Sequence, residues 1–252
     1  MTIFSLSIKI FLREFRSGQL LLMFLSLSLA VGIVASITFF TDRLDGSLMI
    51  ESKQFLGGDL KYESDTPLDE SAFPIGDYSY AGIYEFGSVL GSSNNFQLAS
   101  VKSVSPPYPL IGEFEILKKY DEKVLKSNPP KPGKVWLDTR LASLLEVTIN
   151  DSINIGEKDF SISGIILSES DRGAGSFAFA PKAIMNSSDL EEANVIQPGS
   201  RVRYSYVFVG SQEAIKLLEN FFQSKKKPGD DITTPGNETS PLGRAIKRAS
   251  NF

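Results

Sequence analysis

The 252-residue sequence contains neither cysteine nor histidine. Without cysteine, the chain cannot form a disulfide bond, a thiolate metal site or a cysteine nucleophile. Without histidine, it lacks the side chain that titrates nearest neutral pH, the usual general base and the commonest ligand of transition metals. A hydrolytic site would therefore need a Ser-Lys pair, a carboxylate pair or a metal bound by carboxylates.

Basic residues are too few and too scattered for a nucleic-acid surface. The formal net charge is −4, and because the first 17 residues carry a net charge of +2, the rest of the chain carries −6. Nucleic-acid-binding domains carry a basic stripe instead. We therefore expect no nucleic-acid partner.

Charged residues are also absent from residues 18–40, GQLLLMFLSLSLAVGIVASITFF. This stretch of 23 residues contains no proline and is long enough, as a helix, to cross a hydrocarbon core of ~30 Å. Buried helices of soluble domains rarely run so far without a charged residue on one face. The sequence therefore predicts a transmembrane helix over residues 18–40.

Charges flank this predicted helix unevenly. Basic residues dominate before it and acidic residues after it (Lys9, Arg13 and Arg16 against Glu14; Asp42 and Asp45 against Arg43). The positive-inside rule then predicts a cytoplasmic N-terminus and a main domain on the other side of the membrane.

A cleaved signal peptide is the alternative interpretation of the same stretch. Signal peptides have an apolar region of about 7 to 15 residues followed by a small-x-small cleavage site. The apolar run here is longer, and the nearest candidate site, Ile33-Val34-Ala35, fits that pattern poorly. We therefore expect a retained anchor that crosses the membrane once in this chain.

Two further segments flank the predicted transmembrane helix. Residues 1–17 place apolar residues at helical spacing, which fits either an amphipathic cytoplasmic segment or a longer transmembrane helix with snorkelling basic ends. Residues 41–57 keep an apolar helical spacing that stops at Gly57-Gly58. We expect residues 41–57 to form a helical stalk that couples the next domain to the bilayer mechanically.

Residues 58–223 carry the signals of an α+β domain with antiparallel strands and short helices. The expected strands are apolar or alternating stretches bounded by turn residues: 59–63, a hairpin of 78–90 and 96–104, 134–137, a hairpin of 149–155 and 160–166, 177–180, and 202–209. The expected helices are one capped by Asp138 over 141–145, one over 183–193, and one capped by Ser211 over 213–222. Residues 224–240 are predicted to be a hydrophilic linker that does not pack, and residues 241–252 a basic pre-membrane segment.

The sharpest candidate for catalysis is the stretch Ser168-Glu169-Ser170-Asp171-Arg172-Gly173, which brings acid, hydroxyl and arginine into one loop. A loop at the end of strands is often polar for solvation alone. Gly173-x-Gly175 lacks the lysine and hydroxyl of a phosphate-binding loop. The sequence therefore predicts no catalytic, cofactor-binding or metal-binding residue, and no cofactor.

Several segments together resemble a known family. FLREFRSGQLLLMFLSLSLAVG, followed by a stalk and FLGGDLKYES, resembles the start of FtsX-like, MacB-type ABC transporter permeases, in particular their YbbP-like branch. QLASVKSVSPPYPLIGEFEI resembles that branch in its strand and its turn (Tyr108, Pro109, Leu110 and Gly112). VWLDTRLASLLEVTINDSINIGEKDFSISGII is similar to the MacB-like periplasmic core domain, and QPGSRVRYSYVF and PLGRAIKRASNF also resemble the branch.

The resemblance implies a permease subunit of the bacterial inner membrane rather than an enzyme. Such a subunit pairs with a separate cytoplasmic ABC ATPase, contacts membrane lipid, can form a homodimer, and couples ATP hydrolysis by its partner to periplasmic movement during export or lipid handling. The chain ends at Phe252, where the resemblance places the next membrane helix, so we expect either a fragment of a longer gene or a truncated permease.

Two other functions remain open at this stage. One is a single-pass interaction protein that binds a periplasmic partner or lipid through its sheet edges. The other is a membrane-anchored hydrolase that uses the loop from Ser168 to Arg172.

Overall fold

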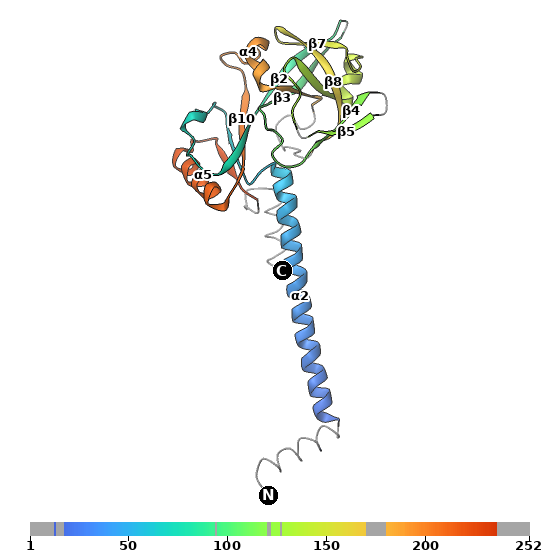
Figure 1. Cartoon of the computed structure of the whole chain (residues 1–252), viewed down its shortest axis with the longest axis vertical. Coiled ribbons are helices and arrows are strands. Elements are labelled where there is room, and N and C mark those ends of the chain that lie inside the picture. Colours follow the sequence, from blue (N-terminus) through green and yellow to red (C-terminus); the bar gives the residue numbers. More distant parts are fainter. Residues whose placement is uncertain are drawn as a thin grey trace. The chain divides into compact units, whose positions relative to one another are not determined.

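A computed structural model describes residues 13, 18–93, 95–119, 122–126, 128–169 and 180–235. The chain divides into two compact units, residues 1–49 and residues 50–252. The first contains most of one long helix, and the second contains a sheet domain (Figure 1). The predicted amphipathic segment 1–17, apart from Arg13, and the predicted pre-membrane segment 241–252 lie outside the described residues.

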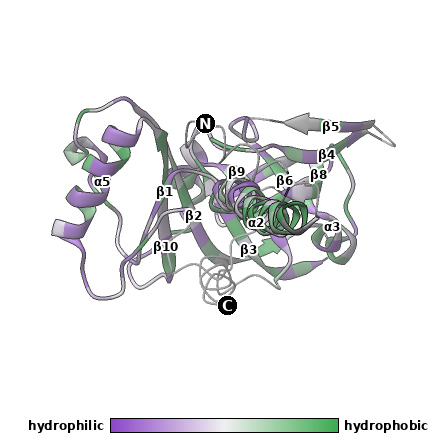
Figure 2. Ribbon diagram, turned by 90° about the horizontal axis from the view of Figure 1, so that it is seen from below, coloured by the Kyte–Doolittle hydropathy of each residue, from purple (hydrophilic) through white to green (hydrophobic). Residues whose placement is uncertain are grey.

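The long helix α2, Gln19–Leu56, is one uninterrupted element of 38 residues. Its apolar side chains are exposed on every side as far as Phe40, and green, apolar turns are prominent where the helix is seen end-on (Figure 2). Charged side chains first follow at Asp42 and Arg43, within the same helix. From Leu20 to Leu56, α2 is long and apolar enough to cross a membrane, and none of its most apolar window is buried in protein.

An 11-stranded sheet forms the framework of the second unit. Its strand order is β11-β1-β10-β2-β3-β9-β6-β8-β4-β5, and β7 pairs with β2 and β8. The strands are β1 Leu60–Ser64, β2 Tyr78–Gly91, β3 Phe96–Val104, β4 Phe114–Lys119, β5 Glu122–Lys126, β6 Lys134–Asp138, β7 Ser152–Ile155, β8 Lys158–Glu169, β9 Lys182–Asn186, β10 Val202–Gly210 and β11 Asp231–Thr233. The helices are η1 Glu70–Ala72, α3 Thr139–Leu145, η2 Ser187–Asp189, α4 Leu190–Ala193 and α5 Gln212–Lys225.

The predicted fold class is confirmed: an apolar N-terminal helix precedes a domain of strands with few, short helices. Both predicted hairpins are present, as β2–β3 and as β7–β8. Two pairings are parallel, β3 with β9 and β6 with β8, so the sheet is mixed rather than wholly antiparallel. Long connections across the sheet produce these parallel pairs, and no local turn signal marks them.

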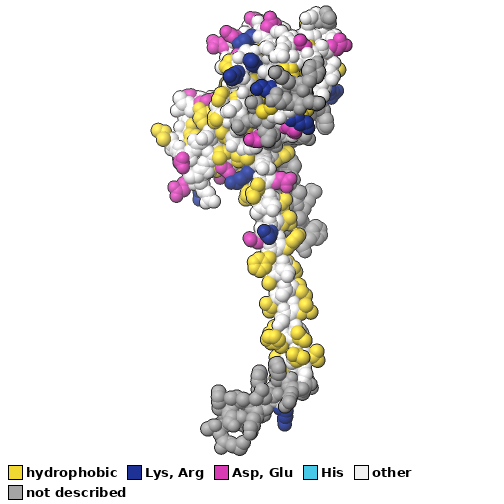
Figure 3. All heavy atoms as spheres, turned by 45° about the vertical axis from the view of Figure 1, so that its right-hand side comes forward, with side chains coloured by type: hydrophobic (Ala, Val, Ile, Leu, Met, Phe, Trp, Pro, Cys, Tyr) yellow, Lys and Arg dark blue, Asp and Glu magenta, His cyan; other side chains and the backbone are white. Residues whose placement is uncertain are grey.

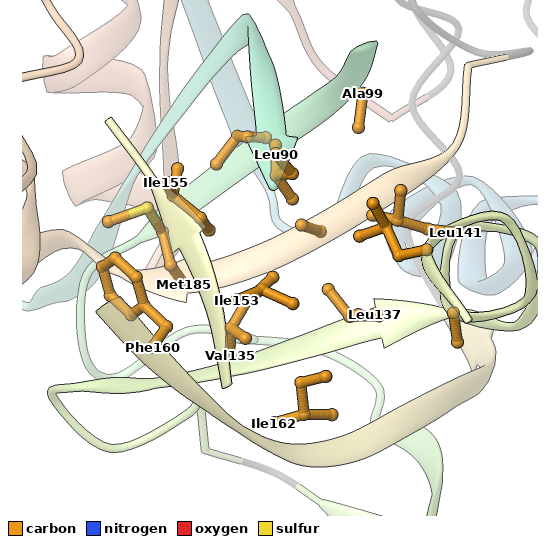
Figure 4. Close-up of a cluster of buried hydrophobic side chains, with 14 of the residues drawn as sticks. Leu90, Ala99, Val135, Leu137, Leu141, Ile153, Ile155, Phe160, Ile162 and Met185 are labelled. Carbon is orange, nitrogen blue, oxygen red and sulfur yellow. The ribbon is translucent and has the colours of Figure 1, made fainter. Parts of the chain in front are cut away.

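The central strands are buried on both faces. In β6, for example, Val135 and Leu137 point to one face and Trp136 to the other. The first face carries two cores. One is mainly aliphatic and includes Ile162, Leu137 and the ring of Phe160 (Figure 4); we call it the aliphatic core. The other, the aromatic core, lies farther along the sheet beside α5. The second face carries a core that includes Tyr108, from the connector between β3 and β4.

Capping residues place the two longer helices of the domain. Asp138 accepts a hydrogen bond from the Leu141 N–H at 2.6 Å and so begins α3, as predicted. Ser211 accepts one from the Ala214 N–H at 3.3 Å and begins α5. Leu218 and Phe222 of α5 are buried in the aromatic core, which lies at the opposite end of the sheet from β4 and β5 (Figures 1 and 2).

The predicted helix over 183–193 is wrong. Residues 182–186 form β9, a central strand between β3 and β6, and only the short η2 and α4 follow it. Because β9 is buried on both faces, its side chains do not alternate in polarity, and a continuous apolar run of this kind resembles a helix face in the sequence.

The prediction that residues 224–240 do not pack is also wrong in part. α5 extends to Lys225, and β11 pairs with β1 within that range. Ile232 is only 4% exposed and joins the aromatic core, which explains why one short strand packs inside a hydrophilic stretch. The predicted strand 177–180 falls almost wholly outside the described residues.

Candidate functional site

The end of α2 and the start of β1 form a compact junction, which we define as residues 52–60. All of these residues belong to the second unit. Ser52 and Leu56, one turn apart on the helix, are 6% and 9% exposed, whereas the apolar side chains of α2 before Phe40 lie open. One side of the last turn of α2 is therefore packed into protein, while Phe55 stays exposed.

Two consecutive glycines make the sharp exit from the helix possible. Gly57 has a positive φ of 76° and donates its N–H to the Gln54 carbonyl at 3.2 Å. A Cβ at Gly58 would lie 2.7 Å from the backbone oxygen of Phe208 in β10. Glycine is thus required at Gly57 by conformation and at Gly58 by the close approach of β10.

Asp59 then ties the helix end to the sheet. Its N–H donates to the Phe208 carbonyl at 2.7 Å, and its Oδ2 accepts the Gly210 N–H at 3.2 Å. Its Oδ1 lies 2.7 Å from the Nζ of Lys53, in the last turn of α2. One carboxylate therefore links the helix to the end of β10, and the ammonium of Lys53 lies where the helix dipole favours positive charge.

A buried ionic cluster lies on the sheet face opposite the aliphatic core. It consists of Lys102 from β3, Glu169 from β8 and Lys182, whose side chain reaches Glu169 from β9. Lys102 donates to Oε1 of Glu169 and, at 2.6 Å, to the Tyr108 hydroxyl. Lys182 donates to Oε2 of Glu169 at 2.7 Å. The side chains of Lys102 and Glu169 are only 3% and 7% exposed.

The electrostatics of the cluster favour the charged form of the Glu169 carboxylate. Burial by itself raises the pKa of Glu169, but the nearby charges of Lys102 and Lys182 and their hydrogen bonds outweigh it and hold the pKa below its ordinary value. Both carboxylate oxygens already have a lysine partner. We interpret Glu169 as the acidic member of a structural ionic cluster that links β3, β8 and β9, not as a general acid or base.

This placement weakens the hydrolytic candidate. Of the stretch Ser168 to Gly173, the structure describes only Ser168 and Glu169, at the end of β8; the other four residues lie outside the described part. Within the described ranges, no group of three or more carboxylates is placed to hold a metal ion.

No local sequence pattern marked Lys102, Lys182 or Asp59 as a functional residue. Lys102 does carry a signal, because it is a lone charge inside the apolar strand QLASVKSV. Its partner lies 67 residues away in the chain, however, and only the folded sheet brings the two together. Gly57-Gly58 was predicted as a helix stop, without its contact to β10.

Comparison with known proteins gives one clear relative. No family model matches the chain. The chain is 30% identical over 249 residues to the "Uncharacterized ABC transporter permease YbbP" of Escherichia coli K12, in an alignment that covers 96% of this chain. The chain spans only 30% of the length of that relative.

The fold of the sheet domain has precedents among solved structures. The periplasmic region of MacB from Actinobacillus actinomycetemcomitans aligns with a TM-score of 0.50 at 11% identity, covering 81% of this chain and 98% of that structure. The extracellular domain of the transporter YknZ from Gram-positive bacteria aligns with a TM-score of 0.43 at 10% identity, covering 70% of this chain and all of that structure. At such identity, the likeness to MacB concerns the fold alone.

These comparisons confirm the resemblance indicated by the sequence motifs. Nearly the whole chain is similar in sequence to the ABC transporter permease YbbP, and its sheet domain has a fold like that of the periplasmic region of MacB, after a helix that is long and apolar enough to span a membrane.

Proposed function

We propose that this chain is the membrane helix and periplasmic domain of an ABC transporter permease subunit, which converts ATP hydrolysis by a separate cytoplasmic ATPase into periplasmic movement. The similarity to the YbbP permease and the apolar surface of α2 support this proposal. The chain itself supplies no ATP hydrolysis. The movement serves export or lipid handling, and a second copy of the chain and membrane lipid are further partners.

The orientation forms part of the same proposal. The N-terminus is cytoplasmic and the sheet domain periplasmic, in a bacterial inner membrane, because basic residues precede the apolar stretch and acidic residues follow it. The apolar stretch 18–40 lies within the bilayer, and the part of α2 from Thr41 to Leu56 emerges as the stalk.

The observation that carries the coupling mechanism is the junction. α2 has no break between its apolar part and Leu56, and its last turn is tied to β10 through Lys53 and Asp59. Gly58 brings the backbone against Phe208 with no space for a side chain. A displacement of the helix end therefore pulls on β10, which lies between β1 and β2 inside the sheet.

The orientation is tested by labelling single introduced cysteines with a membrane-impermeant maleimide in intact spheroplasts. Arg13→Cys is expected to stay unlabelled until the membrane is permeabilised, and Asn220→Cys, on the exposed side of α5, to react at once. The sequence contains no cysteine of its own, so each variant reports one position. Immediate reaction of Arg13→Cys would place the N-terminus outside the cytoplasm and so contradict the proposed orientation.

The coupling is tested in the full-length permease with its ATPase. Three flexible residues, Gly-Gly-Ser, are inserted between Leu56 and Gly57, and the same insertion between Gly199 and Ser200, in an exposed turn, is the control. ATP hydrolysis stimulated by the permease is expected to fall toward the rate of the isolated ATPase only in the first variant. Unchanged stimulation in that variant would contradict the mechanism.

A further inference from the structure

A groove rimmed by lysines lies between β4, β6, β8 and the loop that precedes β6. It has a volume of about 500 Å³, within the range of pockets that hold small ligands. Its floor includes Ile116 and Trp136, which are 1% and 4% exposed and belong to the core on the connector side of the sheet. Pro129 and Pro130 add an apolar wall. We call this site the lysine groove.

The floor of the lysine groove is held firmly in place. At Gly164 of β8, a Cβ would lie 3.0 Å from the Cδ1 of Ile116 and 3.1 Å from the Cδ1 of Trp136. The ring of Phe114 also packs edge-on against the indole, with 5.3 Å between ring centroids. The indole is therefore fixed from two sides by glycine backbone and by an aromatic ring.

Three lysines surround this apolar floor, and each comes from a different segment: Lys118 from β4, Lys131 from the loop and Lys134 from β6. All three are exposed. None forms an ion pair with a carboxylate whose side chain the structure describes. In a chain with a net charge of −4, this is a local concentration of positive charge beside apolar surface, with no ion-pair partner among the described side chains.

A second groove of similar size differs from the lysine groove in its charged lining residues. It has a volume of about 450 Å³ and lies beside α3, where Leu117, Ala142, Val147 and Ile165 contribute to an apolar lining. Among the described residues that line it, Glu146 alone is charged. Apolar surface thus occurs in both grooves, but only the lysine groove combines it with cations.

We propose that the lysine groove binds an anionic single-chain amphiphile, such as the anion of a fatty acid. The carboxylate lies among Lys118, Lys131 and Lys134, and the first part of the alkyl chain lies over Ile116 and Trp136. Each methylene buried in this way raises the affinity by about fourfold, and the lysines select the charged form over the neutral one. This proposal does not depend on the permease function.

The single tryptophan of the chain provides a direct probe, because Trp136 lines the groove itself. Bromine quenches indole fluorescence on contact. The full chain in nanodiscs of zwitterionic lipid is titrated with bromododecanoate and, separately, with the neutral bromododecanol. The anion is expected to quench Trp136 at concentrations at least about tenfold lower than the alcohol, since three charge contacts are lost with the alcohol.

Charge-reversed variants locate the effect. Lys118→Glu combined with Lys134→Glu is expected to raise the concentration of bromododecanoate needed for half-quenching by at least about tenfold. Lys216→Glu combined with Lys226→Glu changes the net charge equally, at exposed positions of α5 and its C-terminal end, and is expected to leave quenching unchanged. The emission maximum of Trp136 checks that each variant is folded.

Three outcomes would overturn the proposal. These are absence of quenching below the concentration at which the amphiphile forms micelles, equal quenching by acid and alcohol, and equal quenching in the two double variants. The last outcome would assign binding to apolar contact or to the overall charge of the chain rather than to the groove.

Discussion

Leucines of α2 and the leucine of β6 occupy opposite environments. Leu25 and Leu29 are 55% and 66% exposed, whereas Leu137 is fully buried in the core on one face of the sheet. The sheet domain surrounds its own apolar residues with protein, and α2 as far as Phe40 does not. Since such a continuous apolar surface is not stable in water, its surroundings must be lipid or other protein.

The charged residues follow the same division. Along α2, apolar atoms cover the lower part of the helix, while basic and acidic side chains are interspersed over the sheet domain (Figure 3). Ion pairs within the domain include the buried one between Lys102 and Glu169. The domain thus buries its own apolar side chains and pairs buried charges within itself. The apolar part of α2 has to be covered by lipid or by other protein.

The largest expected effect is in the aliphatic core. Phe160 is fully buried, and Phe160→Ala is expected to lower the free energy of unfolding of the domain by about 4 kcal/mol, because it removes a large apolar side chain and leaves a cavity. Phe96→Ala, at a position that is 77% exposed, is the matched control and is expected to cost less than about 1 kcal/mol. Chemical denaturation followed by the fluorescence of Trp136 measures both. Equal costs would contradict the burial of Phe160.

A charge in the apolar part of α2 is expected to hinder insertion of the helix into the membrane, rather than to destabilise the sheet domain. Leu29→Lys should raise the free energy of membrane insertion by about 3 to 4 kcal/mol, and Leu29→Ala by less than about 1 kcal/mol. Neither change should alter the unfolding of the sheet domain. A glycosylation-based insertion assay on the segment 18–40 measures the first effect. Insertion that is insensitive to lysine would mean that lipid does not surround α2.

The buried ionic cluster should give the next largest effect. Glu169→Gln is expected to destabilise the domain by about 3 kcal/mol, since it removes the negative charge that offsets the buried ammonium of Lys102. Glu192→Gln is the control, because that side chain is 72% exposed in its ion pair with Lys158 and should cost less than about 1 kcal/mol. If Glu169→Gln and Glu192→Gln lower the free energy of unfolding equally, Glu169 does not have the structural role assigned to it.

The smallest expected effect is on the stability of the domain at acidic pH, and it is specific to Glu169. The pKa of Glu169 in the folded domain lies below its ordinary value, so its contribution to stability is present above the pKa of about 4.3 of unfolded chains. That contribution is lost as the pH falls from there toward the lower folded pKa. Glu169→Gln is therefore expected to flatten the acid limb of the stability curve. An unchanged acid limb would contradict the ion pair.

Local patterns predicted much of this structure. The apolar run of α2, the turn between β2 and β3, and the caps Asp138 and Ser211 are each decided within a few residues, and each was predicted correctly. The apolar strand β9 was mistaken for a helix, since only its position between β3 and β6 explains burial on both faces.

The candidate site was less predictable for the same reason. Gly58 is required because β10 passes beside it, and Glu169 is charged because Lys102 and Lys182 approach from two other strands. β4 and β5, at the far edge of the sheet, were not predicted from their sequence. β11 lies within a polar stretch, and only its pairing with β1 and the burial of Ile232 reveal it. Long-range contacts decide each of these features, and a single sequence does not contain them.

The most direct measurement of the proposed coupling follows the domain relative to the bilayer surface. A donor dye on Asn220→Cys and acceptor dyes on the lipid head groups report energy transfer in nanodiscs that hold the full-length permease and its ATPase. ATP is expected to change the transfer in the otherwise unaltered protein and with the insertion between Gly199 and Ser200, but not with the insertion between Leu56 and Gly57. An equal ATP-dependent change in both insertion variants would contradict transmission through the junction.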